Sequence, residues 1–433
     1  MTNRKIVFTS KNLPKSCTSG SISFVGLISL TVAFYLISEY NVDNYLGAIL
    51  TGLAYVVPVF LLEYIKFKTY KKPSTGLDFR LKNKFNVERV VIKLIGLYFT
   101  LALVAFFYWL FPIYSSDYYT PYWLLAKSLL KIIVFGSIPY FFILDRFLVE
   151  PEESYWKVGM IVLGRWKKTN MGGLKNHFLG WLIKAFFLPL MFLSLCGNIG
   201  FIKEHPFSMV FEQGNFARFF DYMYNFVYTV DLAVIFVGYI LTLRIFDSHI
   251  RTVEPSFLGW FVALQCYQPF WGFVSSNYLS YDGGYSWEQW LWEYQNLYIV
   301  WGAIILILLS IYSLASLYFG LRFSNLTNRG IITNGPYRYM RHPAYVSKNI
   351  SWWLMSIPFI SQQGFLVGLK HCLLLLFVNI IYYLRAKTEE KHLSQDPTYV
   401  QYATVMNEIG IFRGLFKLLP FLKYSPGKLV NRA

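Results

Sequence analysis

The sequence Gly335-Pro-Tyr-Arg-Tyr-Met-Arg-His-Pro-Ala-Tyr345 leads into two apolar runs, residues 345–361 and 365–384. A charged sequence, Arg385-Ala-Lys-Thr-Glu-Glu390, follows the second run directly. Apolar runs of nearly this length predict helices that cross a membrane. The turn between them, residues 361–364, is short, so the two helices should form a tight hairpin. The hairpin would return the charged sequence to the membrane face from which it started.

The rest of the chain has the composition of a membrane protein. Of its 433 residues, 55% are hydrophobic and only 15% are charged, and the mean hydropathy is +0.41. Soluble domains carry about 25% charged residues. We therefore predict an all-α, polytopic integral membrane protein of about ten transmembrane helices. The predicted spans are residues 22–40, 45–65, 94–113, 123–145, 179–200, 222–243, 257–275, 297–320, 345–361 and 365–384.

The basic residues divide the loops into two sets. The chain has a formal net charge of +17 and contains 40 Lys and Arg residues. Only Lys203 and Arg218 fall in the loops 41–44, 114–122, 201–221, 276–296 and 361–364. Because basic loops remain on the cytosolic side of a membrane, both termini and the two charged sequences should face the cytosol. The net charge therefore reflects topology, and we expect no nucleic-acid partner.

The residues before the hairpin favour an anion-binding site. Pro343 restrains His342 away from helical angles and suits the first turn of the helix that follows. Arg341 and His342 should therefore gather at a helix N-terminus, where free N–H groups and the helix dipole attract anions. Tyr339 and Tyr345 offer ring faces for a base or a cation.

The residues after the hairpin complete a predicted pocket on the cytosolic side. Arg385 and Glu389 are four residues apart and share a helix face, so we expect Glu389 to pair with the guanidinium. Such a pocket suits a zwitterionic cofactor with an adenine, a ribose and a cationic centre. Tyrosine rings can stack on the base, a carboxylate can bind ribose hydroxyls, and Arg and His can hold a carboxylate. The alternative is an interfacial loop whose Arg and Tyr side chains face lipid.

The combined motif resembles a known family. Beyond the Gly335–Tyr345 sequence, the chain has Arg385, then Glu389-Glu390-Lys-His-Leu393, then Tyr399-Val-Gln-Tyr402. This pattern over residues 320–405 is similar to the isoprenylcysteine carboxyl methyltransferase family and its wider relatives, which include phospholipid methyltransferases. The resemblance implies a membrane-embedded enzyme that binds S-adenosylmethionine on the cytosolic side and receives a lipid-phase small molecule or lipidated acceptor between its helices.

Roles for individual residues follow from that resemblance. The expected cofactor-binding residues are Tyr339, Arg341, His342, Pro343, Tyr345, Glu389 and Glu390, and the expected catalytic residues are Arg385 and Glu389. The fork of the Arg385 guanidinium suits an anionic acceptor, so O-methylation of a carboxylate or phosphate is favoured. Such an acceptor needs no base, whereas an ammonium acceptor would need one, with Glu389 or Glu390 the nearest candidate.

The chain is predicted to have three parts. Residues 297–410 form the methyltransferase-like core, residues 1–296 form a transmembrane region of unknown role, and residues 411–433 form a cytosolic tail. We favour a bacterial inner membrane over the endoplasmic reticulum. The four cysteines lack the spacing of a metal or redox site, and we expect no metal.

The sequence leaves open two other functions for the protein, and it leaves open the roles of Asp231 and of one further charged run. A sterol-type reductase that uses NADPH has a similar hairpin, although the Glu389-Glu390 pair would repel a 2′-phosphate. A lipid-binding or transport protein that keeps the pocket is the non-enzymatic alternative. Asp231, an ionisable residue at membrane depth, is either functional or paired for structure. The run Asp247–Glu254 either caps and solvates a helix end or approaches the pocket.

Overall fold

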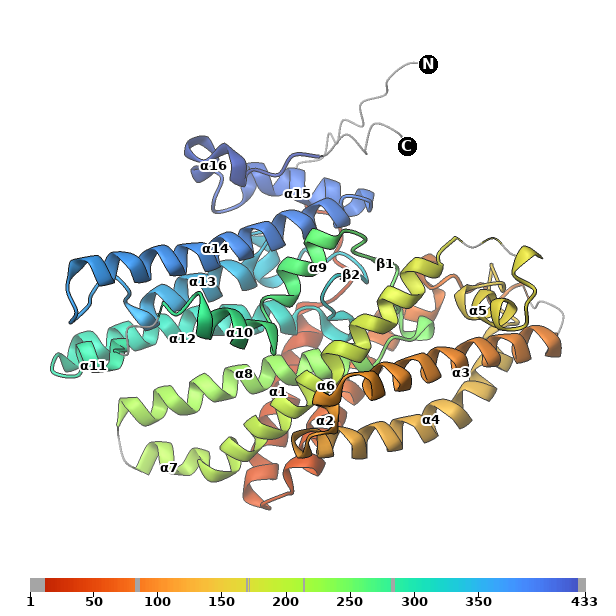
Figure 1. The fold of residues 1–433 in the computed structure, drawn as a ribbon, viewed down its shortest axis with the longest axis horizontal. Coiled ribbons are helices and arrows are strands. Elements are labelled where there is room, and N and C mark those ends of the chain that lie inside the picture. Colours follow the sequence, from red (N-terminus) through yellow and green to blue (C-terminus); the bar gives the residue numbers. More distant parts are fainter. Residues whose placement is uncertain are drawn as a thin grey trace.

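The computed structural model describes residues 12–81, 86–168, 170, 172–212, 215–281 and 285–426. Its described elements are helical except for a small antiparallel ladder of β1 (Thr252–Val253) with β2 (Thr327–Asn328), and an isolated bridge between Leu77 and Leu148 (Figure 1). Within the described part of the chain, eight helices are long and apolar enough to cross a membrane. The prediction of an all-α, polytopic membrane protein is confirmed.

The eight long helices match eight of the predicted spans. Their bounds are α1 (Gly20–Glu39), α2 (Asn44–Phe67), α3 (Val87–Leu110), α4 (Thr120–Leu144), α6 (Leu174–Glu204), α8 (Phe216–Ile240), α12 (Gln295–Leu317) and α14 (Phe365–Leu393). Shorter helices lie between and after them, namely α5 (Ser154–Val162), α7 (Phe207–Glu212), α11 (Trp287–Leu291), α15 (Pro397–Ile409) and α16 (Leu415–Leu418).

The predicted span 257–275 is not one helix. It is divided into α9 (Phe257–Leu264) and α10 (Phe270–Asn277), which are too short to cross a bilayer alone. Pro269 stands at the start of α10, and a proline disfavours helical angles in the residue before it, here Gln268. The prediction of one continuous helix over this apolar run is therefore wrong. The break carries Tyr267 into the interior, where it becomes part of the site.

The predicted span 345–361 is also shorter than a full crossing. It corresponds to α13 (Pro343–Ser356), whose 14 residues extend about 21 Å at a rise of 1.5 Å each. A bilayer core is about 30 Å thick. The helix begins at Pro343, as predicted, and ends where Ile357 adopts a left-handed conformation ahead of Pro358. The count of continuous spans among the described residues is therefore eight instead of ten.

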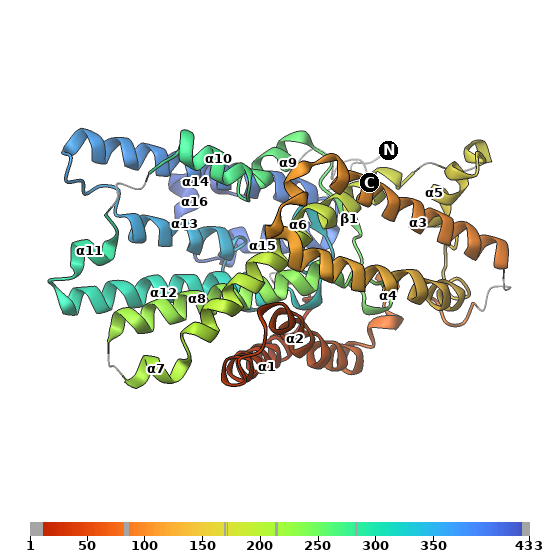
Figure 2. The ribbon, with the colours of Figure 1, turned by 60° about the horizontal axis from the view of Figure 1, so that its bottom comes forward.

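The helices α12, α13 and α14 lie at one end of the molecule and α3, α4 and α5 at the other (Figures 1 and 2). In both views α12, α13 and α14 lie side by side, and α12 also packs against α8. The pair α1 and α2 and the long helix α6 pack against α8, whereas α3, α4 and α5 extend to the opposite end of the molecule. Helix α9 packs on α14, so α8, α9, α12, α13 and α14 surround a common interior.

Both ends of the described chain pack on the segment between β2 and α13. Near the N-terminus, the Cys17 N–H donates to the Ile331 carbonyl at 3.1 Å, and Asn334 Nδ2 donates to the Thr18 carbonyl at 3.1 Å. Near the C-terminus, Arg341 Nη2 donates to the Leu422 carbonyl at 2.7 Å. The two ends therefore lie at the same end of the hairpin. That this is the cytosolic side stays a prediction.

A buried arginine fixes the loop that precedes this segment. The Arg329 guanidinium donates to five backbone carbonyls, those of Gly238, Leu241, Ser248, Leu321 and Phe323. Burial, reinforced by Arg322, lowers the pKa of Arg329 to about 9, so the group stays charged at neutral pH. The end of α8 and the end of α12 are thereby tied to one side chain, which sets the position of the residues between them.

Candidate functional site

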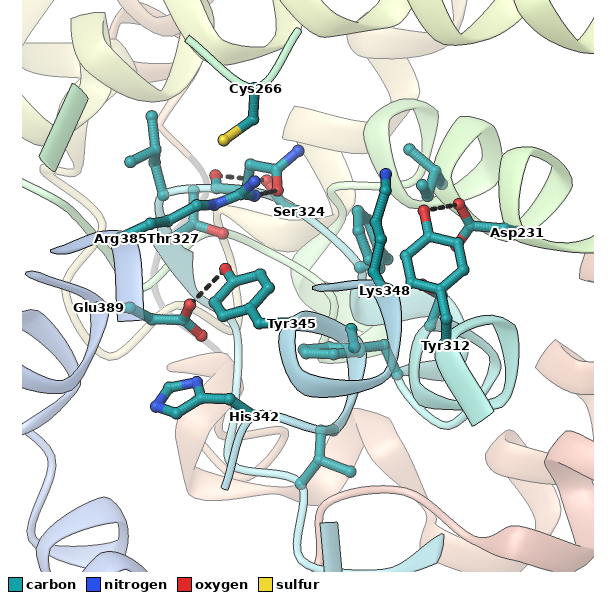
Figure 3. Close-up of a pocket in the computed structure, with 18 of the residues that line it drawn as sticks. Asp231, Cys266, Tyr312, Ser324, Thr327, His342, Tyr345, Lys348, Arg385 and Glu389 are labelled. Carbon is teal, nitrogen blue, oxygen red and sulfur yellow. Dashed lines mark hydrogen bonds between the residues drawn. The ribbon is translucent and has the colours of Figure 1, made fainter. Parts of the chain in front are cut away.

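A cavity of about 440 Å³ lies at the meeting point of the C-terminal hairpin with α6, α8, α12 and the break between α9 and α10. Its volume falls in the range of small-molecule sites. Five of the residues singled out in the sequence line it, namely Arg341, His342, Tyr345, Arg385 and Glu389. Figure 3 shows four of them together, with Tyr345 between His342 and Arg385.

Tyr345 and Glu389 join the two ends of the hairpin. Tyr345 lies in the first turn of α13, and its hydroxyl donates to Glu389 Oε2 on α14 at 2.7 Å (Figure 3). The Tyr345 ring stacks on the His342 ring, with centroids 5.5 Å apart and an angle of 7° between the planes. The phenol satisfies one oxygen of Glu389, and the carboxylate carries its charge on the cavity wall.

The predicted ion pair between Arg385 and Glu389 does not form. Its Nη2 donates to Asn325 Oδ1 at 2.7 Å, and its guanidinium lies 4.9–5.8 Å from the ring centroids of Tyr267, Tyr345 and Tyr382. The two side chains bind different partners instead, because Asn325 accepts from Arg385 and Tyr345 donates to Glu389. The guanidinium is buried and forms no ion pair with a carboxylate in the described chain.

Asn325, which accepts from Arg385, is held in place by further hydrogen bonds. Its backbone N–H and its Nδ2 both donate to the Tyr239 hydroxyl of α8, at 3.1 and 2.8 Å. The Tyr267 hydroxyl, placed by the break at Pro269, donates to Asn325 Oδ1 at 3.2 Å. Neither Asn325 nor Tyr267 was identified from the sequence, because both lie far from Arg385 along the chain and neither belongs to a recognisable motif.

Glu390 has a different environment from its neighbour Glu389. It contacts Arg341 Nε at 3.2 Å, His342 Nε2 at 3.1 Å and Lys387 Nζ at 3.0 Å. We call these four residues, Arg341, His342, Lys387 and Glu390, the Glu390 cluster. The Glu390 side chain is only 6% exposed and is absent from the cavity lining. The cluster thus neutralises its carboxylate within the protein.

The C-terminal segment covers the outer side of the Glu390 cluster. Arg341 Nη1 donates to Asn407 Oδ1 of α15 at 2.7 Å, and its guanidinium lies over the rings of Phe416 and Tyr424. On the inner side, the Tyr402 hydroxyl donates to the Tyr337 carbonyl at 2.7 Å. Burial raises the pKa of Tyr402, so this phenol remains protonated and keeps the bond. Residues 411–426 thus pack on the core instead of extending away from it.

The remaining two residues of the predicted site lie outside the cavity lining. Tyr339 is 59% exposed, and its backbone carbonyl accepts from the Ile411 N–H. Pro343 is buried as the first residue of α13, and its carbonyl accepts from the Ser347 hydroxyl at 2.7 Å. The structure therefore places Tyr339 at the surface. Pro343 instead begins the helix whose first turn carries Tyr345.

The inner end of the cavity contains polar or charged groups from three helices. Asp231 of α8 accepts from the Tyr312 hydroxyl of α12 at 2.5 Å, and Lys348 of α13 points between Tyr312 and Tyr345 (Figure 3). Asp231 was left open in the sequence, and the structure places it in the same cavity as Arg385. Lys348 was missed, although a lysine in an apolar run three residues after Tyr345 should share its helix face.

The run Asp247–Glu254 is divided between two environments. Asp247 is buried and contacts Lys72, Arg251 and Arg322 at 3.4, 3.1 and 3.8 Å, outside the cavity lining. Burial alone would raise the pKa of Asp247, but Arg322 and Arg251 outweigh it and lower the pKa. Glu254 instead lines the cavity, with its Oε1 bound to the Ser256 hydroxyl and its Oε2 without a hydrogen-bond partner.

Comparison with known proteins identifies one part of the chain. Residues 296–395 match the model of the isoprenylcysteine carboxyl methyltransferase (ICMT) family. The matched segment spans α12, α13 and α14, which contribute Tyr345, Arg385 and Glu389. No curated protein and no solved structure matches the chain. Together with the eight apolar helices, the family match supports a membrane methyltransferase.

Proposed function

We propose that the protein transfers a methyl group from S-adenosylmethionine to a lipid-like acceptor, with a carboxylate or phosphate oxygen as the favoured target. The observation that carries the proposal is the contrast on one cavity wall. Glu389 keeps a carboxylate there with one phenol as its partner, and Arg385 keeps a guanidinium there with no carboxylate. One group can receive a cationic, hydroxyl-bearing cofactor, and the other can receive an anionic acceptor.

The residues present fit S-adenosylmethionine. Glu389 presents a carboxylate to the cavity, and this carboxylate can accept hydrogen bonds from the ribose hydroxyls or from the ammonium group of the cofactor. Tyr345 and Tyr399 line the cavity with aromatic rings suited to an adenine, and the Tyr399 hydroxyl has no hydrogen-bond partner in the described chain. His342 uses Nε2 to bind Glu390, which leaves Nδ1 for the ligand. The Glu390 cluster would then set the orientation of the histidine ring.

S-adenosylmethionine, when bound, supplies a methyl group on a positively charged sulfur. The protein would contribute alignment and exclusion of water, which can account for a large part of such a rate enhancement. Arg385 would hold the acceptor oxygen by charge and hydrogen bonding, while the rings of Tyr267, Tyr345 and Tyr382 keep water away from the guanidinium. A carboxylate or phosphate is already a nucleophile at neutral pH, so this reaction requires no general base.

The two rival functions make different demands on the same wall. NADPH carries a 2′-phosphate, and a carboxylate facing the cavity, such as Glu389, would repel it unless a cation intervened. A lipid-binding protein without activity needs no place for a cofactor at all. The combination of an open carboxylate with a methyltransferase-family hairpin favours methyl transfer over both.

The test is competitive cofactor binding to the purified full-length protein in lipid nanodiscs. Radiolabelled S-adenosylmethionine is expected to bind at one site per chain, to be displaced by S-adenosylhomocysteine, and to remain bound in the presence of NADPH. Displacement by NADPH alone would favour the reductase, and binding of neither cofactor would favour the non-enzymatic function. Glu408→Gln, which changes an exposed carboxylate of α15, is the matched control for substitutions at Glu389.

A further inference from the structure

The inner end of the cavity contains two polar groups whose bonding is incomplete. Asp231 is 2% exposed, and although Tyr312 donates to its Oδ2, its Oδ1 forms no hydrogen bond. The Ser316 side chain, one turn further along α12, lies within weak hydrogen-bonding range of the Asp231 carboxylate, but no hydrogen bond of ordinary geometry reaches Oδ1. A buried carboxylate oxygen without a donor is costly and calls for a partner.

Lys348 is the second incomplete group. Its ammonium lies 5.0 Å from the Tyr312 ring centroid and 5.4 Å from that of Trp352. These ring faces attract a cation, but they do not replace an oxygen as hydrogen-bond acceptor for the three N–H groups of the ammonium. Within the described residues the Lys348 ammonium has no hydrogen bond and no ion pair, and it does not reach Asp231.

Lys348 and Arg385 are two like charges that line one cavity. They lie on either side of Tyr345 (Figure 3), and Lys348 is attracted by Asp231 and, more weakly, repelled by Arg385. Neither cation forms an ion pair with a carboxylate in the described chain. An anion that contacts both cations would relieve the repulsion between them most directly.

We propose that Lys348 and Arg385 hold the acidic group of the methyl acceptor between them, and that Asp231 accepts a hydrogen bond from a hydroxyl or amino group on a neighbouring atom of the same acceptor. The acceptor class is therefore an amphiphilic acid that carries such a substituent. This inference rests on the proposed function, because it identifies the ligand as the acceptor of that reaction.

The proposal gives the N-terminal region a part in the reaction. Asp231 belongs to α8, which lies outside the segment that matches the methyltransferase family, whereas Tyr312, Lys348 and Arg385 lie inside it. The substituent on the acceptor would be recognised by the N-terminal region, and its acidic group by the hairpin. Selectivity for the acceptor would then depend on the contact between α8 and α12.

The experiment measures binding without S-adenosylmethionine. The full-length protein in phosphatidylcholine nanodiscs is titrated with oleate, 2-hydroxyoleate or oleyl alcohol, and affinity is obtained from the concentration dependence of the thermal unfolding temperature. The wild type is expected to bind 2-hydroxyoleate most tightly and oleyl alcohol most weakly. Because no methyl transfer is involved, failure of the proposed reaction and failure of this subsite give different results.

Substitutions assign the preference to individual residues. Lys348→Gln should lower affinity for both acids about tenfold and leave the alcohol unchanged, as expected for loss of a charged hydrogen bond. Lys348→Arg should keep most of the preference for acids. Asp231→Asn should remove the advantage of 2-hydroxyoleate over oleate and nothing else. Lys370→Gln, at an exposed lysine of α14, is the matched control.

Oleoyl lysophosphatidate, which carries a phosphate and a hydroxyl, distinguishes the two acid chemistries. Tighter binding than 2-hydroxyoleate supports a phosphate acceptor, and weaker binding supports a carboxylate, each with dependence on Lys348. Equal affinity of the wild type for acids and alcohol would overturn the proposal. So would a preference for acids that persists in Lys348→Gln, the result expected if only water satisfies these two groups.

Discussion

Glu389 and Glu390 are adjacent on α14 but lie in opposite environments. Glu390 contacts the cations of Arg341 and Lys387 and the imidazole of His342, whereas Glu389 is held by one phenol and faces the cavity. Successive residues of a helix point about 100° apart, so one glutamate can support the wall that the other completes. The difference teaches that the motif contains both residues buried in the protein and residues that face the cavity, which its spacing alone does not separate.

The largest expected effect is on stability, from Glu390→Gln. The substitution removes the carboxylate and leaves the nearly buried Arg341 and the partly buried Lys387 without an ion pair. Removing one partner of a buried pair typically costs about 3–5 kcal/mol. We expect the free energy of unfolding in detergent to fall by about 3 kcal/mol, while Glu408→Gln changes it by less than about 0.5 kcal/mol. Unchanged stability in Glu390→Gln would show that the cluster is not structural.

The next effect is on turnover, from Arg385→Lys. Lysine keeps the charge but loses the fork and the hydrogen bond to Asn325. A charged hydrogen bond contributes about 1.5–3 kcal/mol, so turnover should fall roughly tenfold to a hundredfold while affinity for S-adenosylmethionine stays within about twofold. Arg413→Lys, at an exposed arginine, is the control in the same methyl-transfer assay. Full turnover in Arg385→Lys would remove its role at the acceptor.

Glu389→Gln tests the other half of the comparison. It keeps the size of the side chain and an acceptor for the Tyr345 hydroxyl, but removes the charge that would face the cofactor. Affinity for S-adenosylmethionine should fall about tenfold, measured by equilibrium binding. The free energy of unfolding should change much less than in Glu390→Gln. If the two substitutions exchanged these effects, the assignment of the two glutamates would be reversed.

The smallest expected effect is a pH dependence at His249, beside the Asp247 ion pairs. Burial, with repulsion from Arg244, lowers the pKa of His249 to about 3. The unfolded chain binds that proton near pH 6.5, so between these values it binds more protons than the folded protein, and stability falls as pH falls.

From pH 7 to pH 5.5 this should cost about 1 kcal/mol of unfolding free energy. His249→Gln should lack that part of the slope when thermal unfolding is followed at both pH values. An identical slope in the two proteins would mean that His249 binds protons equally in the folded and unfolded states, which would contradict the lowered pKa.

Much of the hairpin could be predicted because its signals are local. Pro343 begins α13, Gly364 precedes α14, and the basic and acidic residues on either side return to one end. The motif also led to Tyr345, Arg385 and Glu389, which line one cavity. These features depend on spacing along one or two helices, which a sequence displays directly.

The errors arose where distant segments compete for the same side chain. The four-residue spacing brought Arg385 and Glu389 to one helix face, but Asn325 and Tyr345 bind them separately. Hydropathy counted residues 257–275 and 345–361 as full spans, because it does not register that Pro269 and Pro358 interrupt a helix. Asp231, Lys348 and the Tyr312 that contacts both come from three helices, so their shared cavity emerged only from the packing.

The most direct measurement follows tritium from the methyl group of S-adenosylmethionine into lipids. Membranes containing the full-length protein are incubated with the labelled cofactor and a total lipid extract, and the labelled lipids are then treated with mild alkali. We predict that the label enters a lipid that is acidic before methylation. Mild alkali should release the label as volatile methanol if the acceptor is a carboxylate and leave it in a non-volatile product if the acceptor is a phosphate. Absence of label from every lipid fraction, in a protein that remains folded, would contradict methyl transfer to a lipid-like acid.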